Sequence, residues 1–84
     1  MARLWIGNID DTASDEELKD LLRKYGFPEP AEVERVPGDG SRPAAILTFE
    51  QVAPEGLQLL VPRVHDLFWK RRKLTVQVMR DTFA

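Results

Sequence analysis

The sequence predicts an α+β domain in which two helices cover one face of a four-stranded antiparallel sheet. Apolar runs with strand-like alternation and runs with helical spacing follow each other in the order β-α-β-β-α-β. The 84 residues are too few for a second core, so residues 1–84 are expected to form a single domain. Apolar residues make up 43% of the chain and charged residues 31%, a balance typical of soluble globular proteins.

The first strand is expected at about residues 3–7, within "RLWIGNI". Successive side chains of a strand point to opposite faces of the sheet. If Leu4 and Ile6 enter the core, Trp5 stands on the other face, towards solvent. An exposed tryptophan indicates a ligand, a protein partner or packing across the sheet.

The first helix is expected from Asp15 to Tyr25. Ser14 and Glu17 have the spacing of a capping box, and Gly26 supplies the stop. The apolar residues then follow at helical spacing, as Leu18, Leu21, Leu22 and Tyr25.

Two strands are expected in the middle of the chain, at 31–36 and 43–49. The turn-rich loop "PGDGS" (37–41) between them predicts a hairpin. Alternation in the second of these strands divides it into a core face with Ala45, Leu47 and Phe49 and an outer face with Ala44, Ile46 and Thr48.

Pro54 is expected to open the second helix, which should end or kink near Val61 because Pro62 follows. A basic stretch at 70–73 precedes a final alternating strand at 74–79. This order is that of the ferredoxin-like sandwich, whose two helices leave one face of the sheet bare. The bare face accounts for an exposed Trp5.

Three motifs on this framework resemble those of the RNA recognition motif (RRM) family. "LWIGNI" (4–9) fills every position of the six-residue ribonucleoprotein box, which reads aliphatic, aromatic, aliphatic, any, Asn, aliphatic. "RPAAILTF" (42–49) matches the octapeptide box only in part, at Arg42, Ala45, Leu47 and Phe49, and departs from it at Pro43, Ala44 and Ile46. "KRRKLTV" (70–76) is similar to the family's Gly-Arg-x-Leu-x-Val, with Arg71 in place of glycine.

The resemblance implies a single-stranded RNA-binding module that uses the open face of the sheet. Trp5 would stack on a base, the basic residues would contact phosphates, and Gln77 would hydrogen-bond a base. The candidate RNA-binding residues are Arg3, Trp5, Asn8, Arg42, Ala44, Ile46, Lys70, Arg71, Arg72, Lys73 and Gln77.

The octapeptide box lacks the family's exposed aromatic rings, because Ala44 and Ile46 stand in their places. Each base stacked on a ring contributes on the order of 1–3 kcal/mol. The loss of two rings is therefore expected to cost roughly 2–6 kcal/mol, which predicts binding in the micromolar range or weaker.

The alternative is a protein-interaction module on the same fold. Exposed aromatic side chains such as Trp5 are also enriched in protein interfaces, and the first helix is acidic. Peptide-binding relatives carry an Arg-x-Phe motif before the last strand, and "HDLFWKRR" (65–72) lacks it. That binding mode is therefore not expected for this chain. As a separate expectation, a monomer is favoured.

No feature of the sequence indicates catalysis, a metal or another cofactor. The chain has no cysteine, His65 is its one histidine, and no nucleophile–base pair is evident. We therefore expect a protein that is not an enzyme.

The sequence favours a cytoplasmic protein and RNA bound at one end. No apolar run approaches the roughly 18 residues of a membrane span, and the N-terminus does not read as a signal peptide. Residues 1–60 carry 6 basic and 12 acidic residues, a net charge of −6, whereas 61–84 carry 6 and 2, a net charge of +4. A polyanion would be attracted to the basic C-terminal part.

Overall fold

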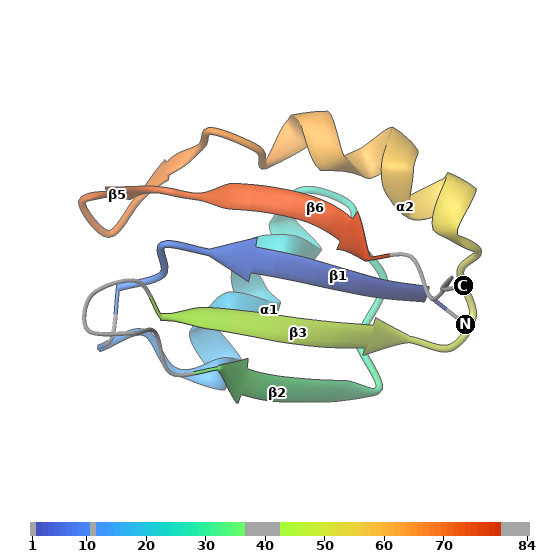
Figure 1. The fold of residues 1–84 in the computed structure, drawn as a ribbon, viewed down its shortest axis with the longest axis horizontal. Coiled ribbons are helices and arrows are strands. Elements are labelled where there is room, and N and C mark those ends of the chain that lie inside the picture. The colour runs from blue at the N-terminus through green and yellow to red at the C-terminus, as the bar shows by residue number, and fades with distance from the viewer. Residues whose placement is uncertain (1, 11, 37–42, 80–84) are drawn as a thin grey trace.

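The computed structural model describes residues 2–10, 12–36 and 43–79. Four of the strands in this part of the chain form one antiparallel sheet in the order β2-β3-β1-β6 (Figure 1). They are β1 (Ala2–Gly7), β2 (Glu32–Val36), β3 (Ala44–Phe49) and β6 (Thr75–Met79). The predicted order of the elements along the chain is confirmed, and each strand begins within one residue of its predicted start. The loop predicted at 37–41 lies outside the described residues.

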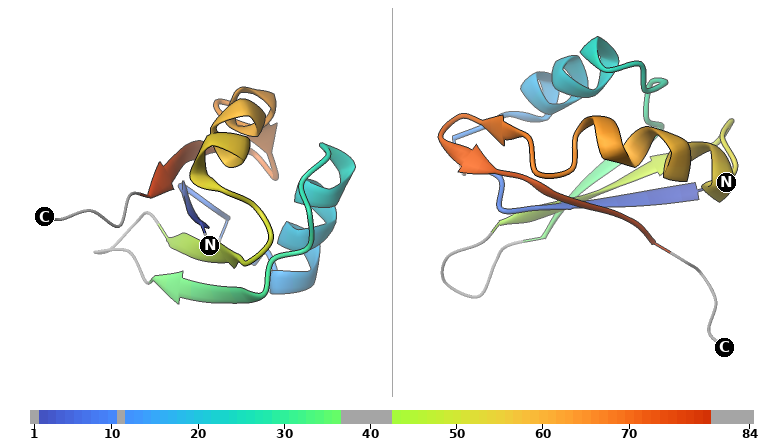
Figure 2. Two further views of the ribbon diagram at one scale, coloured as in Figure 1. Left: turned by 90° about the vertical axis from the view of Figure 1, so that its right-hand side faces the viewer. Right: turned by 90° about the horizontal axis from the view of Figure 1, so that it is seen from above.

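Both helices lie on the same side of the sheet, as the two views in Figure 2 show. Helix α1 spans Asp15–Lys24, and α2 spans Pro54–Leu60, followed by a short 3-10 helix η1 at Val61–Arg63. The regular helix ends at Leu60, close to the predicted Val61, because Pro62 has no backbone N–H to continue the helical hydrogen bonds. The α+β sandwich is therefore confirmed.

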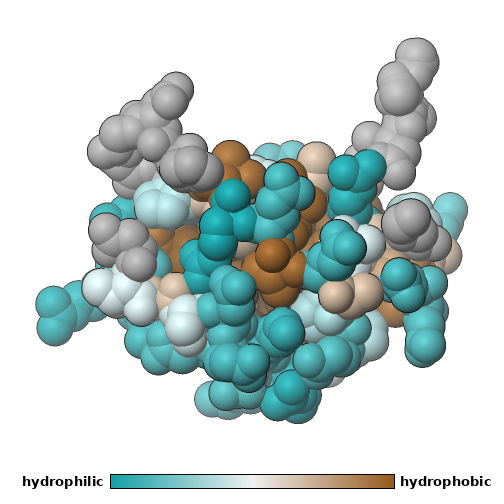
Figure 3. All heavy atoms as spheres, turned by 90° about the horizontal axis from the view of Figure 1, so that it is seen from below, coloured by the Kyte–Doolittle hydropathy of each residue, from teal (hydrophilic) through white to brown (hydrophobic). Residues whose placement is uncertain are grey.

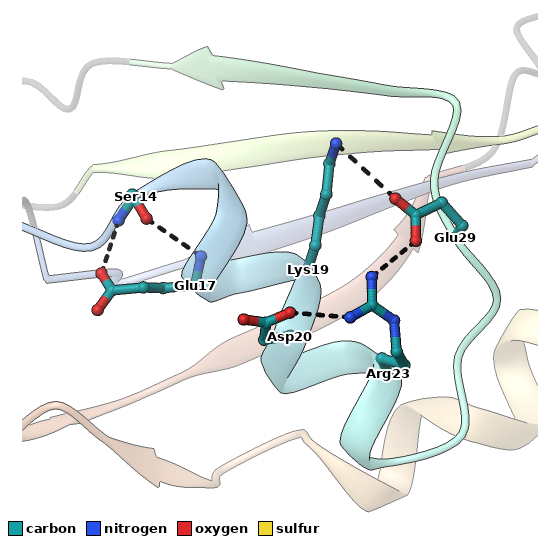
Figure 4. A network of polar contacts seen from close by, with 6 residues as sticks. All are labelled: Ser14, Glu17, Lys19, Asp20, Arg23 and Glu29. Atoms are coloured by element: carbon teal, nitrogen blue, oxygen red, sulfur yellow. Dashed lines mark hydrogen bonds and ion pairs between the residues drawn. The ribbon is translucent and has the colours of Figure 1, made fainter.

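The capping box at the start of α1 is also confirmed (Figure 4). The Glu17 N–H donates to Ser14 Oγ over 3.1 Å, and the Ser14 N–H donates to Glu17 Oε1 over 2.9 Å. Towards the end of the helix, Arg23 contacts Asp20 and Glu29, each at 2.9 Å. Because Glu29 belongs to the connection after α1, these contacts fix the path of the chain from the helix to β2. The Arg23 guanidinium holds the pKa of Glu29 below its usual range.

The core lies between the sheet and the helices. Leu4, Ile6 and Leu47 from the sheet and Leu18 and Leu57 from the helices have no exposed surface. The Phe27 and Phe49 rings meet at a centroid distance of 6.3 Å. Burial of each such side chain stabilises the fold by about 1.5–3 kcal/mol.

The structure adds a two-stranded hairpin before β6, formed by β4 (Phe68–Trp69) and β5 (Arg72–Lys73). Lys70 and Arg71 make its two-residue turn, with φ of 49° and 69°. Positive φ at both central residues is the mark of a type I′ turn, which suits the twist of the flanking strands. Trp69 packs against the core, and Phe68 is 70% exposed.

Within the described residues, no helix is long and apolar enough to span a membrane.

Candidate nucleic-acid interface

The register of the strands arranges the open face of the sheet in rows. In the central row Trp5 lies between Ile46 on β3 and Gln77 on β6, and Glu34 on β2 follows Ile46. Trp5 and Ile46 are partly exposed but are not packed against the core cluster, whereas their chain neighbours are fully buried. The prediction that Trp5 stands on the face opposite the helices is therefore confirmed.

Two further rows complete this open face. Arg3 lies between Thr48 and Met79, with Glu32 at the β2 edge. Gly7 lies between Ala44 and Thr75, with Val36 at that edge. The structure thus brings together five of the predicted site residues on one surface: Arg3, Trp5, Ala44, Ile46 and Gln77.

The indole of Trp5 lies over the backbone of Gly7, two residues further along β1. A Cβ placed on Gly7 would come within 2.8 Å of Cζ2 and Cζ3 of Trp5, and closer still to Cη2. The end of the six-membered ring therefore rests on the strand, and Gly7 is buried. A ring that lies along the sheet and is partly exposed has the geometry that stacking on a base needs.

Asn8 joins the end of β1 to the hairpin. Its Nδ2 donates to the carbonyl oxygen of Lys73 over 2.9 Å, and its Oδ1 accepts from Nη1 of Arg72 at 3.1 Å. Asn8 has φ of 62°, a conformation that asparagine tolerates better than most residues. The structure therefore gives Asn8 a positioning role at the edge of the open face, and its contact with RNA stays a prediction.

The basic residues 70–73 differ in their contacts. Lys70 was expected beside Trp5 as part of a phosphate-binding edge, but its Nζ lies 3.0 Å from Oε2 of Glu17 on α1. The ammonium thus faces the helix layer, because the acidic first turn of α1 attracts it. Arg71 and Lys73 are exposed and make no ion pair within the described part of the chain.

The β2 edge of the open face is acidic. Glu32 and Glu34 are exposed and alternate with Arg35, whose Nε donates to Asp15 on the helix side over 2.8 Å. Figure 3, which views the molecule from the side of β2, shows mainly hydrophilic residues with hydrophobic residues in small patches. A phosphate backbone would be repelled at this edge and attracted at the opposite side, where the basic hairpin lies.

The predicted site residue Arg42 lies outside the described residues, and two other polar residues, Asp10 and His65, support the fold. The carboxylate of Asp10 accepts from the hydroxyl and the N–H of Thr12, which lowers the pKa of Asp10 and stabilises the turn after β1. His65 Nδ1 accepts from the Val76 N–H over 3.1 Å and so supports β6.

No group of three or more histidine, aspartate or glutamate side chains in the described ranges could hold a metal ion.

Comparison with solved structures supports the fold. No model of a protein family matches the chain, and no curated protein sequence matches it significantly. Among solved structures, the chain is similar to "Pes4 RRM3 Structure" with a TM-score of 0.78 and 13% sequence identity, over 100% of this chain and 98% of that chain. The chain has the RRM fold. At this identity the likeness extends to the architecture, so the function of an RRM has to be argued from the residues of the open face.

Sequence reasoning missed two parts of the open face, Gly7 and the acidic edge. Gly7 occupies the unrestricted position of "LWIGNI", and its spacing of two from Trp5 was the available signal, since residues i and i+2 share a face. The same alternation in "AEVERV" (31–36) places Glu32 and Glu34 together.

Proposed function

We propose that this RRM domain binds single-stranded RNA on the open face of its sheet, with Trp5 as the stacking platform. The observation that carries the proposal is the position of the Trp5 indole, which lies on β1 in the middle row of the open face rather than in the core. Tryptophan offers a stacking surface to any base, and stacking tolerates different sequences.

The surroundings of Trp5 suit one base more than a series of bases. Its neighbours Ile46 and Ala44 are aliphatic, so the described part of β3 offers no second ring on this face. Gln77, directly across from Trp5 on β6, is exposed and can donate and accept hydrogen bonds at a base edge. We therefore propose that the open face contacts few nucleotides and binds RNA weakly.

Phosphate contacts come from the hairpin. Asn8 fixes β5 beside the end of β1, so Arg71 and Lys73 lie at the same end of the sheet as the indole of Trp5. Contacts of this kind supply affinity without sequence information and weaken as the salt concentration rises. We infer that the protein binds RNA rather than catalysing a reaction. We further propose that it acts as a monomeric single domain in the cytoplasm, without a cofactor.

Trp5→Ala tests this function, with Phe68→Ala as the matched control. Both substitutions remove an aromatic ring outside the core, but Phe68 borders a groove of about 530 Å³ beside α1, on the helix side. We expect Trp5→Ala to weaken binding of short single-stranded RNAs by about 1–3 kcal/mol and Phe68→Ala to leave it unchanged. Affinity is measured by fluorescence anisotropy of labelled RNA at low and moderate salt.

Equal affinity of wild type and Trp5→Ala would refute the proposed surface. If Phe68→Ala alone weakened RNA binding, the site would lie on the helix side. Binding of a protein through Trp5 with no RNA binding would favour the protein-interaction alternative.

A further inference from the structure

We propose that Gly7 is the positioning residue of the stacking surface: because it lacks a Cβ, the Trp5 indole can lie on β1 and present its outer face to a base. The inference rests on the proposed RNA binding and deepens it by naming the residue that sets the orientation of the ring.

The contact between the two residues carries the inference. A Cβ on Gly7 would lie within 2.8 Å of two carbons of the indole and nearer still to a third, closer than side chains pack. Any larger residue at this position would therefore displace the ring. The displaced group is the far end of a side chain with two rotatable bonds, so the ring can swing away while the strand stays in place.

Backbone geometry does not explain the glycine. Gly26 is the one described glycine with φ in the left-handed region, at 92°, so Gly7 has a backbone that other residues can adopt. Glycine inside a strand weakens it and often marks a site where another group comes close. Here that group is the Trp5 indole.

The residues beside Gly7 also leave room for the ring. Ala44 lies directly opposite on β3 and Thr75 on β6, and both side chains are small. Ala44 is 4% exposed. The indole is thus directed along β1 towards Asn8 and the basic hairpin, where a stacked base would place its phosphate.

The test is a double-mutant cycle with Gly7→Ala, Trp5→Ala and the double variant. RNA affinity is measured with a pool of short single-stranded RNAs, and folding is checked by thermal unfolding. We expect Gly7→Ala to weaken binding by about 5- to 150-fold, as Trp5→Ala does, and the double variant to bind no more weakly than Trp5→Ala alone. Gly56→Ala on α2 is the control for the general effect of replacing a glycine, and it is expected to bind RNA as the wild type does.

A second measurement needs no substitution at position 7. The Gly7 Hα protons lie under the indole, so their NMR signals should be shifted upfield in the wild type and return to ordinary values in Trp5→Ala. This readout tests the position of the ring even if Gly7→Ala fails to fold. Unshifted signals in the wild type would overturn the inference.

The remaining outcomes separate the inference from the proposed function. The inference about Gly7 would be wrong if Gly7→Ala bound RNA with wild-type affinity, or if the double variant were weakened by the product of the two single effects. Either result would leave the proposed RNA binding through Trp5 in place. If Trp5→Ala kept full RNA affinity, the proposed function would fail, and the role of Gly7 in stacking would fall with it.

Discussion

At the scale of single residues, Trp5 differs from the aromatic residues of the core. Phe49 is 1% exposed and meets Phe27, whereas Trp5 is partly exposed and lies on the open face of the sheet, over Gly7. Apolar surface left in water gives up about 25 cal/mol per Å² of the stabilisation that burial would provide. Core packing therefore does not require a tryptophan at this position, and the proposed stacking on a base would give it a role.

Glu17 shows the opposite case, a residue that serves the fold. It accepts the Ser14 N–H in the capping box and pairs with Lys70 of the hairpin. These two contacts, with the Ser14 N–H as the larger cause, lower the pKa of Glu17 from its ordinary value of 4.5. A carboxyl group whose pKa is lower in the folded state stabilises the fold above its unfolded pKa, and the stabilisation is lost as the pH falls through the folded value.

Glu17→Gln should therefore lower the stability at pH 7, and the difference from the wild type should disappear as the pH falls well below 4.5. Glutamine keeps an acceptor for the capping box but loses the charge that pairs with Lys70. Urea unfolding at a series of pH values measures the effect. Glu16→Gln removes the same charge from the same turn of α1. It serves as the control because Glu17, and not Glu16, forms the capping box and pairs with Lys70. Equal destabilisation by both variants at pH 7 would contradict this account.

At the scale of elements, the β4–β5 hairpin combines an unfavourable turn with a basic surface. Lys70 and Arg71 hold positive φ, which costs roughly 1–2 kcal/mol for each residue with a side chain. Asparagine and glycine are the usual residues of such turns. The chain thus keeps two cations where other residues would be more stable, which fits a phosphate-binding role for Arg71.

Arg71→Gly should stabilise the fold by up to about 1 kcal/mol and at the same time weaken RNA binding. The gain comes from relief of the positive φ, offset in part by the greater freedom of glycine in the unfolded chain. Loss of one phosphate contact should reduce the salt dependence of RNA affinity by about one unit of slope.

Arg71→Ala separates these two effects, because it removes the charge and keeps a side chain at positive φ. It should weaken RNA binding like Arg71→Gly without the gain in stability. A stabilised Arg71→Gly with unchanged RNA affinity would show that Arg71 contacts no phosphate.

Strand β3 offers a gain-of-function prediction. Ile46 lies beside Trp5, outside the core cluster, at a position where RRM domains carry an aromatic ring. Ile46→Phe should increase RNA affinity by about 1–3 kcal/mol because it adds a second stacking platform. Isothermal titration with the same RNA pool measures the change, and Ile46→Leu, which adds no ring, should leave the affinity unchanged. A loss of affinity in Ile46→Phe would indicate that the RNA does not pass over β3.

At the scale of the whole molecule, the two edges of the sheet differ in charge. The edge strand β2 carries Glu32 and Glu34 on the open face, while the basic hairpin leads into the other edge strand, β6. The net charges of −6 over 1–60 and +4 over 61–84 follow the same division. An RNA strand is therefore expected to follow β1 and β6 and to avoid β2.

The architecture was predictable from the sequence because its signals are local and agree with one another. The capping box at Ser14, the alternation around Ile46 and the break before Pro62 each act within a few residues. Together they set the order of the elements and the faces of the strands.

The finer features of the site were not predictable, because they join distant residues or contradict propensity. The pair of Lys70 with Glu17 and the bonds of Asn8 to β5 each span more than 50 positions of the chain. The hairpin turn uses lysine and arginine where type I′ turns favour asparagine and glycine. The position of the Trp5 indole over Gly7 depends on a rotamer, which the sequence pattern does not reveal.

The most direct test of RNA binding by the open face is an NMR titration of the wild-type protein with short single-stranded RNAs, at low salt and again at higher salt. We predict salt-sensitive shifts of the Trp5 indole N–H and of the amides of Gly7, Ile46 and Gln77 and of residues 71–73, with smaller shifts along β2. Shifts confined to α1 and Phe68, or no shifts at low salt, would contradict the proposal that the open face of this sheet binds RNA.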